Sequence, residues 1–460
     1  MSMKKDDAII VGCGIGGSIA GAYLAKGGLK TTIFEKTDNI GGAKYRSYKL
    51  GDITTDLCHI PVSCITLNGG FGWWVKAARE LGAAIQWQAL PNTQVYFKGN
   101  LITMPYCTSG RAFSDFITQM MPLPEDAQKE LAKVFDAAIN MPEEKLWSHE
   151  MNEMPFQTWL AQQTDNELVK RLFNVMDDVS LVGATGQTSV TCTMTIMVGF
   201  LSGWVNCTYM TNGTADQIPK SFCRVATEHD AQVLLEHTVT EVIIENGRAK
   251  GVIVKDAEGK EKIYETEYVL INACYDVLGQ MLGKNMPKEV QIACQSMERA
   301  HDIDIEVHFA LKERIAHPTG CQIQVLDENM TYKCNFLYPD TWNRSLAPRG
   351  QAILAQKYAT VAEFESRSAD EWKDYFRDVA EMIFPGFKDV IELEQAHIMR
   401  TTAGHYSFFY GPKVPIECPG ISNVYFIGDY TQAPGIVTER AASSATIAAK
   451  KILGQISKMK

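Results

Sequence analysis

The feature that most constrains this chain is a glycine-rich turn between two predicted strands near the N-terminus. Residues 6–11 are mainly apolar and predict the first strand, and residues 12–17 carry glycine at the first, third and sixth positions. A helix pattern follows at residues 18–26, and a second apolar strand at residues 31–34 ends on Glu35. A strand, a turn of this spacing, a helix and an acidic residue about 20 positions further on predict a dinucleotide-binding unit in an α/β fold.

The residue types in this turn have physical reasons. Gly12 allows the tight turn, Gly14 lets the backbone approach a pyrophosphate, and Gly17 lets helix and strand pack closely. The helix N-terminus favours phosphates, and the Glu35 carboxylate suits ribose hydroxyls better than a 2′-phosphate. An ordinary glycine-rich turn is the simpler alternative, but it explains neither the second strand nor the terminal acid. The predicted contacts to the dinucleotide are Gly12, Gly14, Ile15, Gly16, Gly17 and Glu35.

A second signature lies at the opposite end of the chain. Residues 423–427 predict an apolar strand that ends in Gly428-Asp429, and a helix rich in alanine and serine follows at residues 437–453. With the N-terminal turn, this pattern resembles the large FAD-dependent family of amine oxidases, protoporphyrinogen oxidases and phytoene-type desaturases. The resemblance implies that Asp429 binds the ribityl chain of FAD. It also implies that the helix start points backbone N–H groups at the flavin N1/O2 edge, where negative charge develops on reduction. The residues concerned are Gly435, Ile436 and Val437.

Three further segments match the same family in the expected order. The first carries basic side chains around a second glycine pair and resembles the family's segment near the pyrophosphate. Its residues are Lys36, Gly41, Gly42, Lys44 and Arg46. Residues 212–219 resemble the family's Gly-Gly-x-x-x-(Ile/Leu)-Pro segment, with Asn212 in place of the first glycine. Residues 234–254 resemble the hairpin that holds the adenine, with Val239 at the contacting position.

The resemblance implies an α/β fold with two domains, each assembled from separate stretches of the chain. A chain of 460 residues is also too long for one simple core. We expect a discontinuous Rossmann-like FAD-binding domain of the glutathione-reductase type, formed by residues 1–85, 210–290 and 395–460. The stretches 86–209 and 291–394 are expected to form an inserted α+β substrate domain. Helix patterns fall at residues 125–140, 156–175 and 370–384, and strand patterns at residues 303–311, 321–326 and 351–358.

Charge and cysteine content argue against several other kinds of protein. The formal net charge is −10 and no cluster of Lys and Arg is present, which argues against nucleic-acid binding. The 12 cysteines show no C-x-x-C pair and no zinc spacing, so we expect reduced buried thiols and no metal site. Cys13, inside the glycine turn, is expected to pack beside the pyrophosphate. The charged first residues do not predict a signal peptide, so we expect a cytoplasmic protein, with peripheral membrane contact if the substrate is a lipid.

No residue between positions 179 and 215 carries a charge. Threonine, glycine, serine and asparagine interrupt this stretch too often for a transmembrane helix, which needs about 20 mainly apolar residues. We therefore expect helices that are buried on all sides, some of which line a cavity for an apolar or aromatic substrate. An ordinary core without such a cavity is the alternative.

The best candidate for catalysis is a strand at residues 301–309. Its alternation places apolar residues on one face and Asp304, Glu306 and His308 on the other. In amine-oxidase relatives a comparable strand places a lysine that holds a water near flavin N5. Counting back from Lys312 puts Glu306 at that position, so the lysine is missing here. Either the polar face points at the flavin and moves a proton, or it is simply solvated.

Two other segments supply weaker candidates. Tyr406 or Tyr410 resembles the aromatic residues with which relatives line the substrate side of the flavin, and ordinary packing is the alternative. His59 ends a segment that resembles the family's Asp-x-Gly, with cysteine in place of glycine. It either reaches the cavity or is a structural histidine. Residues 430–440 contain no cysteine, so we expect FAD to be bound noncovalently.

These observations favour an FAD-dependent oxidoreductase of the phytoene-desaturase-like branch. It would transfer hydride between a C–C (CH–CH) bond of an apolar or polyene-like substrate and flavin N5, as a desaturase, a saturase or a redox-neutral isomerase. A flavin amine oxidase is the alternative, with Glu306 or Asp304 holding a cationic substrate. A remote alternative is a non-catalytic binding protein like the GDP-dissociation inhibitors, against which the intact Glu35 and Gly428-Asp429 argue. The electron acceptor (oxygen, quinone or NAD) and the oligomeric state leave no readable signature.

Overall fold

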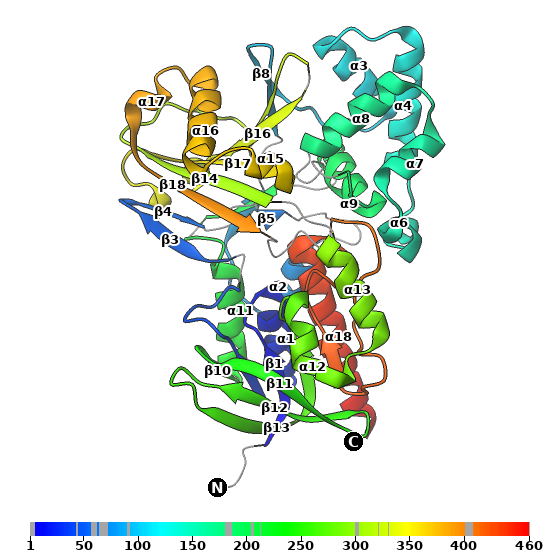
Figure 1. Cartoon of the computed structure of the whole chain (residues 1–460), viewed down its shortest axis with the longest axis vertical. Helices are drawn as coiled ribbons and strands as arrows, with labels where there is room; N and C mark the ends of the chain where they lie inside the picture. Colours follow the sequence, from blue (N-terminus) through cyan, green and yellow to red (C-terminus); the bar gives the residue numbers. More distant parts are fainter. Residues whose placement is uncertain are drawn as a thin grey trace.

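The computed structural model describes residues 5–42, 45–56, 62–63, 72–89, 93–179, 186–203, 207–211, 213–299, 303–320, 322–329, 331–400 and 408–459. Figure 1 shows three groups of elements: a lower sheet with helices packed on it and, above it, a second sheet and a separate group of helices. The lower group contains both strand β1 (Lys5–Val11) and helix α18 (Val437–Met459). The two ends of the sequence therefore belong to one structural unit.

The lower sheet has seven strands in the order β10-β2-β1-β13-β12-β11, with β19 beside β13. β1 pairs in parallel with β2 and β13, and β19 is parallel to β13. β1 is apolar and buried along most of its length, and β2 is buried throughout, as expected for parallel strands covered on both faces. The strand bounds are β2 Thr31–Phe34, β10 Gln232–Leu234, β11 Thr238–Glu245, β12 Arg248–Lys255, β13 Glu261–Ile271 and β19 Val424–Phe426.

Helices cover both faces of the lower sheet. α1, α2, α11 and α18 share one apolar core with it, and α12 and α13 pack in a second core on the opposite face. Every residue of α1 except the last is buried, because α1 lies against the sheet, α11 and α18. The bounds are α1 Ile15–Lys26, α2 Trp73–Leu81, α11 Gln217–Glu228, α12 Leu278–Leu282 and α13 Lys288–Arg299.

The upper sheet has seven strands in the order β18-β14-β17-β16-β15-β7-β8 and is mostly antiparallel. α16 and α17 cover one face, where Ile303, Ile305 and Val307 of β14 enter their apolar core. β14 has the bounds of the strand pattern predicted at residues 303–311, and the alternating stretch at residues 301–309 begins and ends two residues earlier. The bounds are β7 Gln94–Phe97, β8 Asn100–Thr103, β14 Ile303–Leu311, β15 Gln322–Leu326, β16 Tyr332–Leu337, β17 Gln351–Ala359, β18 Ile391–Arg400, α16 Ala369–Ile383 and α17 Phe387–Val390.

The third group consists of short helices packed around their own apolar core. The prediction of one helix over residues 156–175 is wrong, because two helices, α7 and α8, occupy this stretch. The Asn166 side chain accepts hydrogen bonds from the Leu168 and Val169 N–H groups at 3.1 and 3.2 Å, which starts a new helix. The bounds are α3 Gly110–Met120, α4 Glu125–Ile139, α5 Glu143–Leu146, α6 His149–Glu153, α7 Phe156–Gln163, α8 Glu167–Val179, α9 Val190–Thr193, a π-helical turn Met194–Val198 and α10 Gly199–Leu201.

The uncharged stretch is buried around its central helix. Every residue of the segment 190–198 is buried, which confirms the expectation of a helix enclosed on all sides. Thr188 and Thr193 each donate a hydroxyl hydrogen bond of 2.7 Å to Asp177 of α8. Burial raises the pKa of Asp177 to about 6. Within the described part of the chain, no helix combines the length and the apolar character needed to cross a membrane.

Smaller elements connect the three groups. Two of the remaining strands form a hairpin, three form a small sheet, and two short helices flank β17 in the sequence. Their bounds are β3 Ser47–Leu50, β4 Ile53–Asp56, β5 Val62–Ser63, β6 Trp87–Ala89, β9 Cys207–Met210, α14 Pro339–Trp342 and α15 Val361–Glu365.

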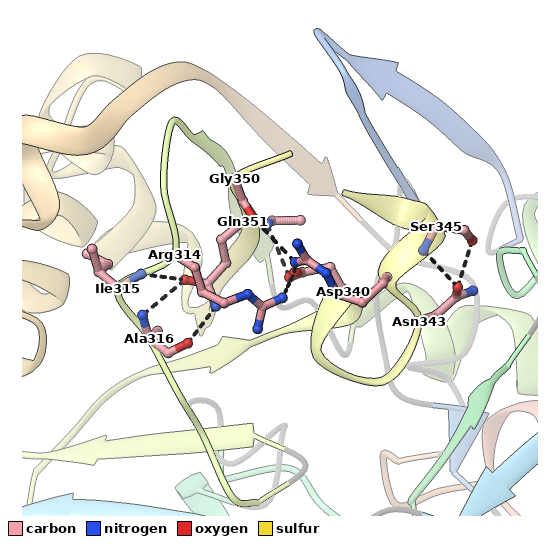
Figure 2. Close-up of polar contacts among 10 residues, drawn as sticks. Arg314, Ile315, Ala316, Asp340, Asn343, Ser345, Gly350 and Gln351 are labelled. Atoms are coloured by element: carbon pink, nitrogen blue, oxygen red, sulfur yellow. Dashed lines mark hydrogen bonds and ion pairs between the residues drawn. The ribbon is translucent and has the colours of Figure 1, made fainter. Parts of the chain in front are cut away.

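A buried carboxylate orders the loops at one end of the upper sheet (Figure 2). Asp340 is fully buried and binds the guanidinium groups of Arg314 and Arg344, the latter at 2.8 Å. Burial raises the pKa of Asp340, and the two arginines oppose this shift. The Gln351 side chain accepts from the Ala316 N–H group at 3.0 Å and donates to the Ala316 carbonyl at 2.7 Å. These contacts hold α14, the start of β17 and the loop after β14 as one unit.

Asn343 connects this unit to the lower group. Its side-chain N–H donates to the Gly213 carbonyl at 2.9 Å. Its oxygen accepts from the Ser345 hydroxyl at 2.6 Å, as Figure 2 shows. The strands of the lower sheet come from the stretches predicted as FAD-binding, and those of the upper sheet from the predicted substrate stretches. Of the described elements, three cross predicted boundaries: β9 ends at residue 210, α13 continues past residue 290, and β18 continues past residue 394 to Arg400. The division into two domains remains a proposal.

Candidate active site

The two sequence signatures meet at one edge of the lower sheet. β1, β2 and β19 run in the same direction, so Gly12, Glu35 and Gly428, which follow them, lie at the same carboxyl edge. The Cys13 N–H group donates to Glu35 Oε2 at 2.8 Å, which joins the first two loops directly. Open α/β sheets bind their ligands outside such an edge.

The glycine turn is packed too closely for side chains. Gly12 has a φ of +92°, in the left-handed region that favours glycine. A Cβ on Gly17 would lie 2.0 Å from the Gly12 carbonyl oxygen, so glycine is needed for α1 to approach β1. A Cβ on Gly14 would lie 3.9 Å from Gly42 Cα, and Gly41 N–H donates to the carbonyl of the same turn at 3.1 Å. The second glycine pair therefore packs against the first.

The Cys13 side chain points into the core beneath this turn. Its Sγ lies 3.1 Å from Cys223 Sγ on α11. The hydrogen bond with Cys223 and burial raise the pKa of the Cys13 thiol well above its usual value. The cysteines whose side chains are described are free thiols, and all of them except Cys274 are buried.

Asn272 holds the turn from below and was missed by the sequence reasoning. Oriented so that both ends of its amide find partners, it donates to the Ile427 carbonyl at 3.0 Å. Its oxygen accepts from the N–H groups of Gly17 at 3.2 Å and Gly14 at 3.3 Å. The side chain thus joins the ends of β13 and β19 to the start of α1. Its sequence signal is only an asparagine directly after an apolar strand.

Glu35 lies beside the loop that would receive the adenosine. Its buried carboxylate accepts from Cys13 N–H and from the N–H and hydroxyl of Thr37 at 3.0 and 2.9 Å. The His237 N–H group donates to the Glu35 carbonyl at 2.8 Å, which brings the start of β11 and the buried Val239 to the same loop. A carboxylate has about four acceptor positions, so Glu35 retains capacity for ribose hydroxyls.

Of the described residues, the structure does not hold the other predicted members of this site against the glycine turn. Lys36 is exposed and Arg46 partly exposed, so neither side chain is held against the glycine turn by burial. Tyr410 is exposed as well. Three predicted residues lie outside the described part of the chain: Lys44, His59 and Tyr406. The described residues contain no group of His, Cys, Asp or Glu side chains that is arranged to hold a metal ion.

The first turn of α18 is tightly folded. Gly435 has a φ of +98°, and a Cβ on it would lie 2.9 Å from Glu439 Cβ. Val437 has a φ of +48°, which is strained for a β-branched residue. The buried Ile436 accepts from Glu439 N–H at 3.0 Å, and Arg440 Nε donates to the Gly435 carbonyl at 2.7 Å.

These features fit a dinucleotide of the FAD type. α1 starts at Gly14, which has no side chain with which to cap the helix, so this helix end is suited to a phosphate. The turn lies so close to the Asn272 side chain that added Cβ atoms on Gly14 or Gly16 would lie within 3 Å of its amide. Asp429 follows on the same edge and leads to the first turn of α18. Together they would hold the pyrophosphate, the ribityl chain and the flavin edge.

The polar face of β14 is buried. Asp304 and Glu306 are 0% exposed and His308 is 1% exposed, which excludes the alternative that this face is solvated. This face is opposite to the one covered by α16. Tyr358 of β17, which shares it, packs into the apolar core of the lower group. The three predicted catalytic residues are therefore brought together on the side of the upper sheet that faces the lower group.

A glutamine holds both carboxylates of this face. Gln356 Nε2 lies 3.1 Å from Asp304 Oδ2, 3.0 Å from Glu306 Oε1 and 3.1 Å from the Tyr358 hydroxyl. His308 Nε2 lies 3.0 Å from the other oxygen of Glu306, Oε2. Glu306 therefore has one oxygen fixed by an amide and the other in contact with a group that can carry a proton.

The contacts continue from His308 to the edge of the sheet. His308 Nδ1 lies 2.8 Å from the Tyr48 hydroxyl, which lies 2.8 Å from His397 Nε2. Burial and the neighbouring His308 lower the pKa of His397 to about 4, so its ring is neutral near pH 7. Sequence reasoning missed Gln356 and His397, which pair directly with Glu306 across the sheet, and Tyr48 on β3.

Comparisons with known proteins identify the family and agree with the fold. A sequence profile of the family described as flavin containing amine oxidoreductase matches residues 15–453. A comparison with curated proteins gives no match. An oxidoreductase from Methanosarcina mazei superimposes with a TM-score of 0.71 at 19% identity, over 97% of this chain and 100% of that one. Cyclohexylamine oxidase from Brevibacterium oxydans gives 0.66 at 15% identity, and putrescine oxidase bound to putrescine 0.66 at 14%, each over 98% of this chain and 99% of the other. At these identities the similarity establishes the fold.

Proposed function

Because the chain belongs to the flavin-containing amine oxidoreductase family, and is thus an FAD-dependent oxidoreductase, we propose which reaction it catalyses. The proposed reaction is hydride transfer between a CH–CH bond of an apolar substrate and FAD, with Glu306 moving the accompanying proton. The observation that carries the proposal is the buried contact between Glu306 and His308 on β14, at the position that the resemblance assigns to a lysine.

FAD, when bound, supplies the hydride acceptor or donor. The residues of this chain supply position and proton transfer. Removing hydride from one carbon of a CH–CH bond requires loss of a proton from the next, and Glu306 is the proposed acceptor. Gln356 donates to Glu306 Oε1 and leaves Oε2 to exchange the proton with His308 Nε2. The hydroxyl of Tyr48 and His397 would then carry it toward the edge of the upper sheet.

The apolar substrate is supported by the uncharged segment. Residues 190–198 are buried and contain no charge. A substrate that contacts this segment would meet no charged partner, and burying its charged groups there would cost free energy. In contrast, the polar groups of the β14 face form one hydrogen-bonded network with Gln356, Tyr358, Tyr48 and His397. This combination suits a substrate that is apolar except at the reacting bond.

A flavin amine oxidase is the second candidate. Asp304 and Glu306 are two buried carboxylates held within hydrogen-bond distance of the same amide, and a substrate ammonium would compensate their charge. The fold similarity to putrescine oxidase and cyclohexylamine oxidase favours testing this reading. In that case Asp304 or Glu306 would bind the cation.

Anaerobic mixing of the holoenzyme with probes of both classes tests the proposal. Phytoene in detergent micelles represents the CH–CH class, and putrescine and cyclohexylamine represent amines. Loss of the visible flavin absorption with phytoene, but not with amines, is the expected result. Reduction by an amine alone would replace the first candidate by the second. Reduction by none of the probes would leave the CH–CH proposal without support.

Glu306→Gln is the matched variant, because it keeps the acceptor for Gln356 and removes the base. The expected result is flavin reduction slower by roughly 10²–10⁴-fold at unchanged FAD affinity. A rate equal to the wild-type rate would exclude Glu306 as the proton acceptor.

A further inference from the structure

A buried pair of cationic side chains lies near the start of α18 and has no part in the proposed proton transfer. Arg440 is 0% exposed and Lys413 is 4% exposed. Arg440 belongs to the first turn of α18, and Lys413 lies beside the segment that follows Asp429. The Gln432 side chain donates to the Lys413 carbonyl at 3.1 Å, and Lys413 Nζ donates to the Phe409 carbonyl at 2.5 Å.

The guanidinium group of Arg440 is only partly used by the protein. Nε donates to the Gly435 carbonyl at 2.7 Å, and Nη2 donates to Asn152 Oδ1 on α6 at 2.7 Å. The third nitrogen, Nη1, is buried and has no hydrogen-bond partner among the described residues. A buried charged donor without an acceptor costs free energy. Nη1 therefore indicates an acceptor that this part of the chain does not itself supply.

The electrostatics of the pair point to an anion. Burial, and to a lesser degree the charge of Arg440, lowers the pKa of Lys413 to about 7. Burial also lowers the pKa of Arg440 to about 10, while Asp429 opposes both shifts. Further negative charge placed beside Arg440 would relieve this imbalance. The N-terminus of α18 favours negative charge at the same place.

The position of an FAD molecule along this edge identifies that charge. Glu35, the glycine turn and Asp429 follow one another along the carboxyl edge of the lower sheet, and the chain runs from Asp429 directly to α18. A dinucleotide with its ribose at Glu35 and its pyrophosphate at the turn would therefore have its flavin beyond Asp429, toward the first turn of α18. Hydride addition at flavin N5 leaves one negative charge on the N1/O2 edge of the ring.

We propose that Arg440, supported by Lys413, stabilises the negative charge on the N1/O2 edge of the reduced flavin. Arg440 is then a residue that sets how readily this flavin is reduced. The inference rests on the flavin site of the proposed function, but it does not depend on which substrate is oxidised.

Sulfite titration of the holoenzyme tests this without a substrate, because sulfite adds to flavin N5 and leaves negative charge on the same edge. Arg440→Met is expected to weaken sulfite binding by roughly ten- to a hundredfold, the loss of one charge-assisted hydrogen bond. The flavin midpoint potential is expected to fall by about 30 mV for each tenfold loss. Arg440→Lys keeps the charge and is expected to restore most of the affinity.

Asn152→Ala is the matched control. It removes the contact between Arg440 and α6 but leaves both cations in place, so sulfite affinity is expected to stay at the wild-type value. Wild-type sulfite affinity in Arg440→Met would overturn the proposal and make Arg440 a contact between α18 and α6. If Arg440→Met does not retain FAD, Lys413→Met decides: weaker sulfite binding supports the proposal, and unchanged binding overturns it. A failed substrate assay with normal sulfite results would refute only the proposed reaction.

Discussion

Asn272→Ala tests whether this side chain stabilises the glycine turn in the apoprotein and, through the turn, the binding of FAD. The substitution removes three hydrogen bonds, to the Ile427 carbonyl and from the N–H groups of Gly14 and Gly17. At about 0.5–1.5 kcal/mol each, the loss of all three would cost about 1.5–4.5 kcal/mol. Asn272 is partly exposed at the edge of the sheet, so water replaces some of these hydrogen bonds in the variant. We therefore expect the free energy of unfolding to fall by about 2 kcal/mol.

Urea denaturation of the apoprotein measures this loss, and quenching of FAD fluorescence measures cofactor affinity. We expect Asn272→Ala to lower the free energy of unfolding by that amount and to weaken FAD binding about tenfold, the equivalent of about 1.4 kcal/mol. A change of less than about 0.5 kcal/mol in unfolding would match an ordinary surface substitution. It would refute the conclusion that this amide holds the turn.

Asn272→Asp is a control that keeps the shape of the side chain and adds a negative charge. It keeps the oxygen that accepts from Gly14 and Gly17, and its negative charge stabilises the N-terminus of α1 in the apoprotein. The same charge repels the pyrophosphate. The aspartate variant is therefore expected to unfold less easily than the alanine variant but to bind FAD more weakly. The same order of the two variants in both assays would contradict this account.

Three other results are expected. Tyr48→Phe removes the hydroxyl between His308 and His397 and is expected to slow flavin reduction roughly tenfold without changing FAD affinity, as measured by stopped-flow absorbance; an unchanged rate would exclude this route. Gly17→Ala is expected to abolish FAD binding in equilibrium dialysis, because the new Cβ would lie 2.0 Å from the turn's carbonyl oxygen, and normal binding would contradict that packing. Burial raises the pKa of Asp177 from 3.8 to about 6, so its contribution to stability is present below pH 3.8 and is lost as the pH rises through about 6. The melting temperature of Asp177→Asn relative to the wild type is expected to be higher at about pH 8 than at about pH 4, and an equal difference at both would show that this carboxyl does not titrate as described.

The cofactor site could be predicted because its residues act through local backbone geometry. The need for glycine at positions 12 and 17 follows from a turn and a helix that are adjacent in sequence, and the structure confirms the packing. Glu35 follows the next strand, so its approach to the turn follows from parallel pairing alone. The existence of β14 was predicted for a similar reason, since alternation is a property of one strand.

Residues that act through distant pairing could not be predicted. Gln356 and His397 lie opposite Glu306 only because β17 and β18 pair with β14 in one particular register. A shift by one residue would move both side chains to the other face, and nothing in either strand pattern fixes the register between them. The single helix predicted over 156–175 failed for another reason. The apolar pattern continues across the break, but the Asn166 side chain begins a second helix there.

The order of strands in the lower sheet has a consequence for biosynthesis. β1 pairs with β13 from Lys5 opposite Glu265, and α1 packs against α18, which is made long after α1 itself. At translation rates of about 5–20 residues per second, β1 waits on the order of ten to fifty seconds for β13 to be made. Asp429 and the first turn of α18 emerge later still. Capture of the cofactor therefore has to await the synthesis of α18, and a chain released before α18 cannot complete the site.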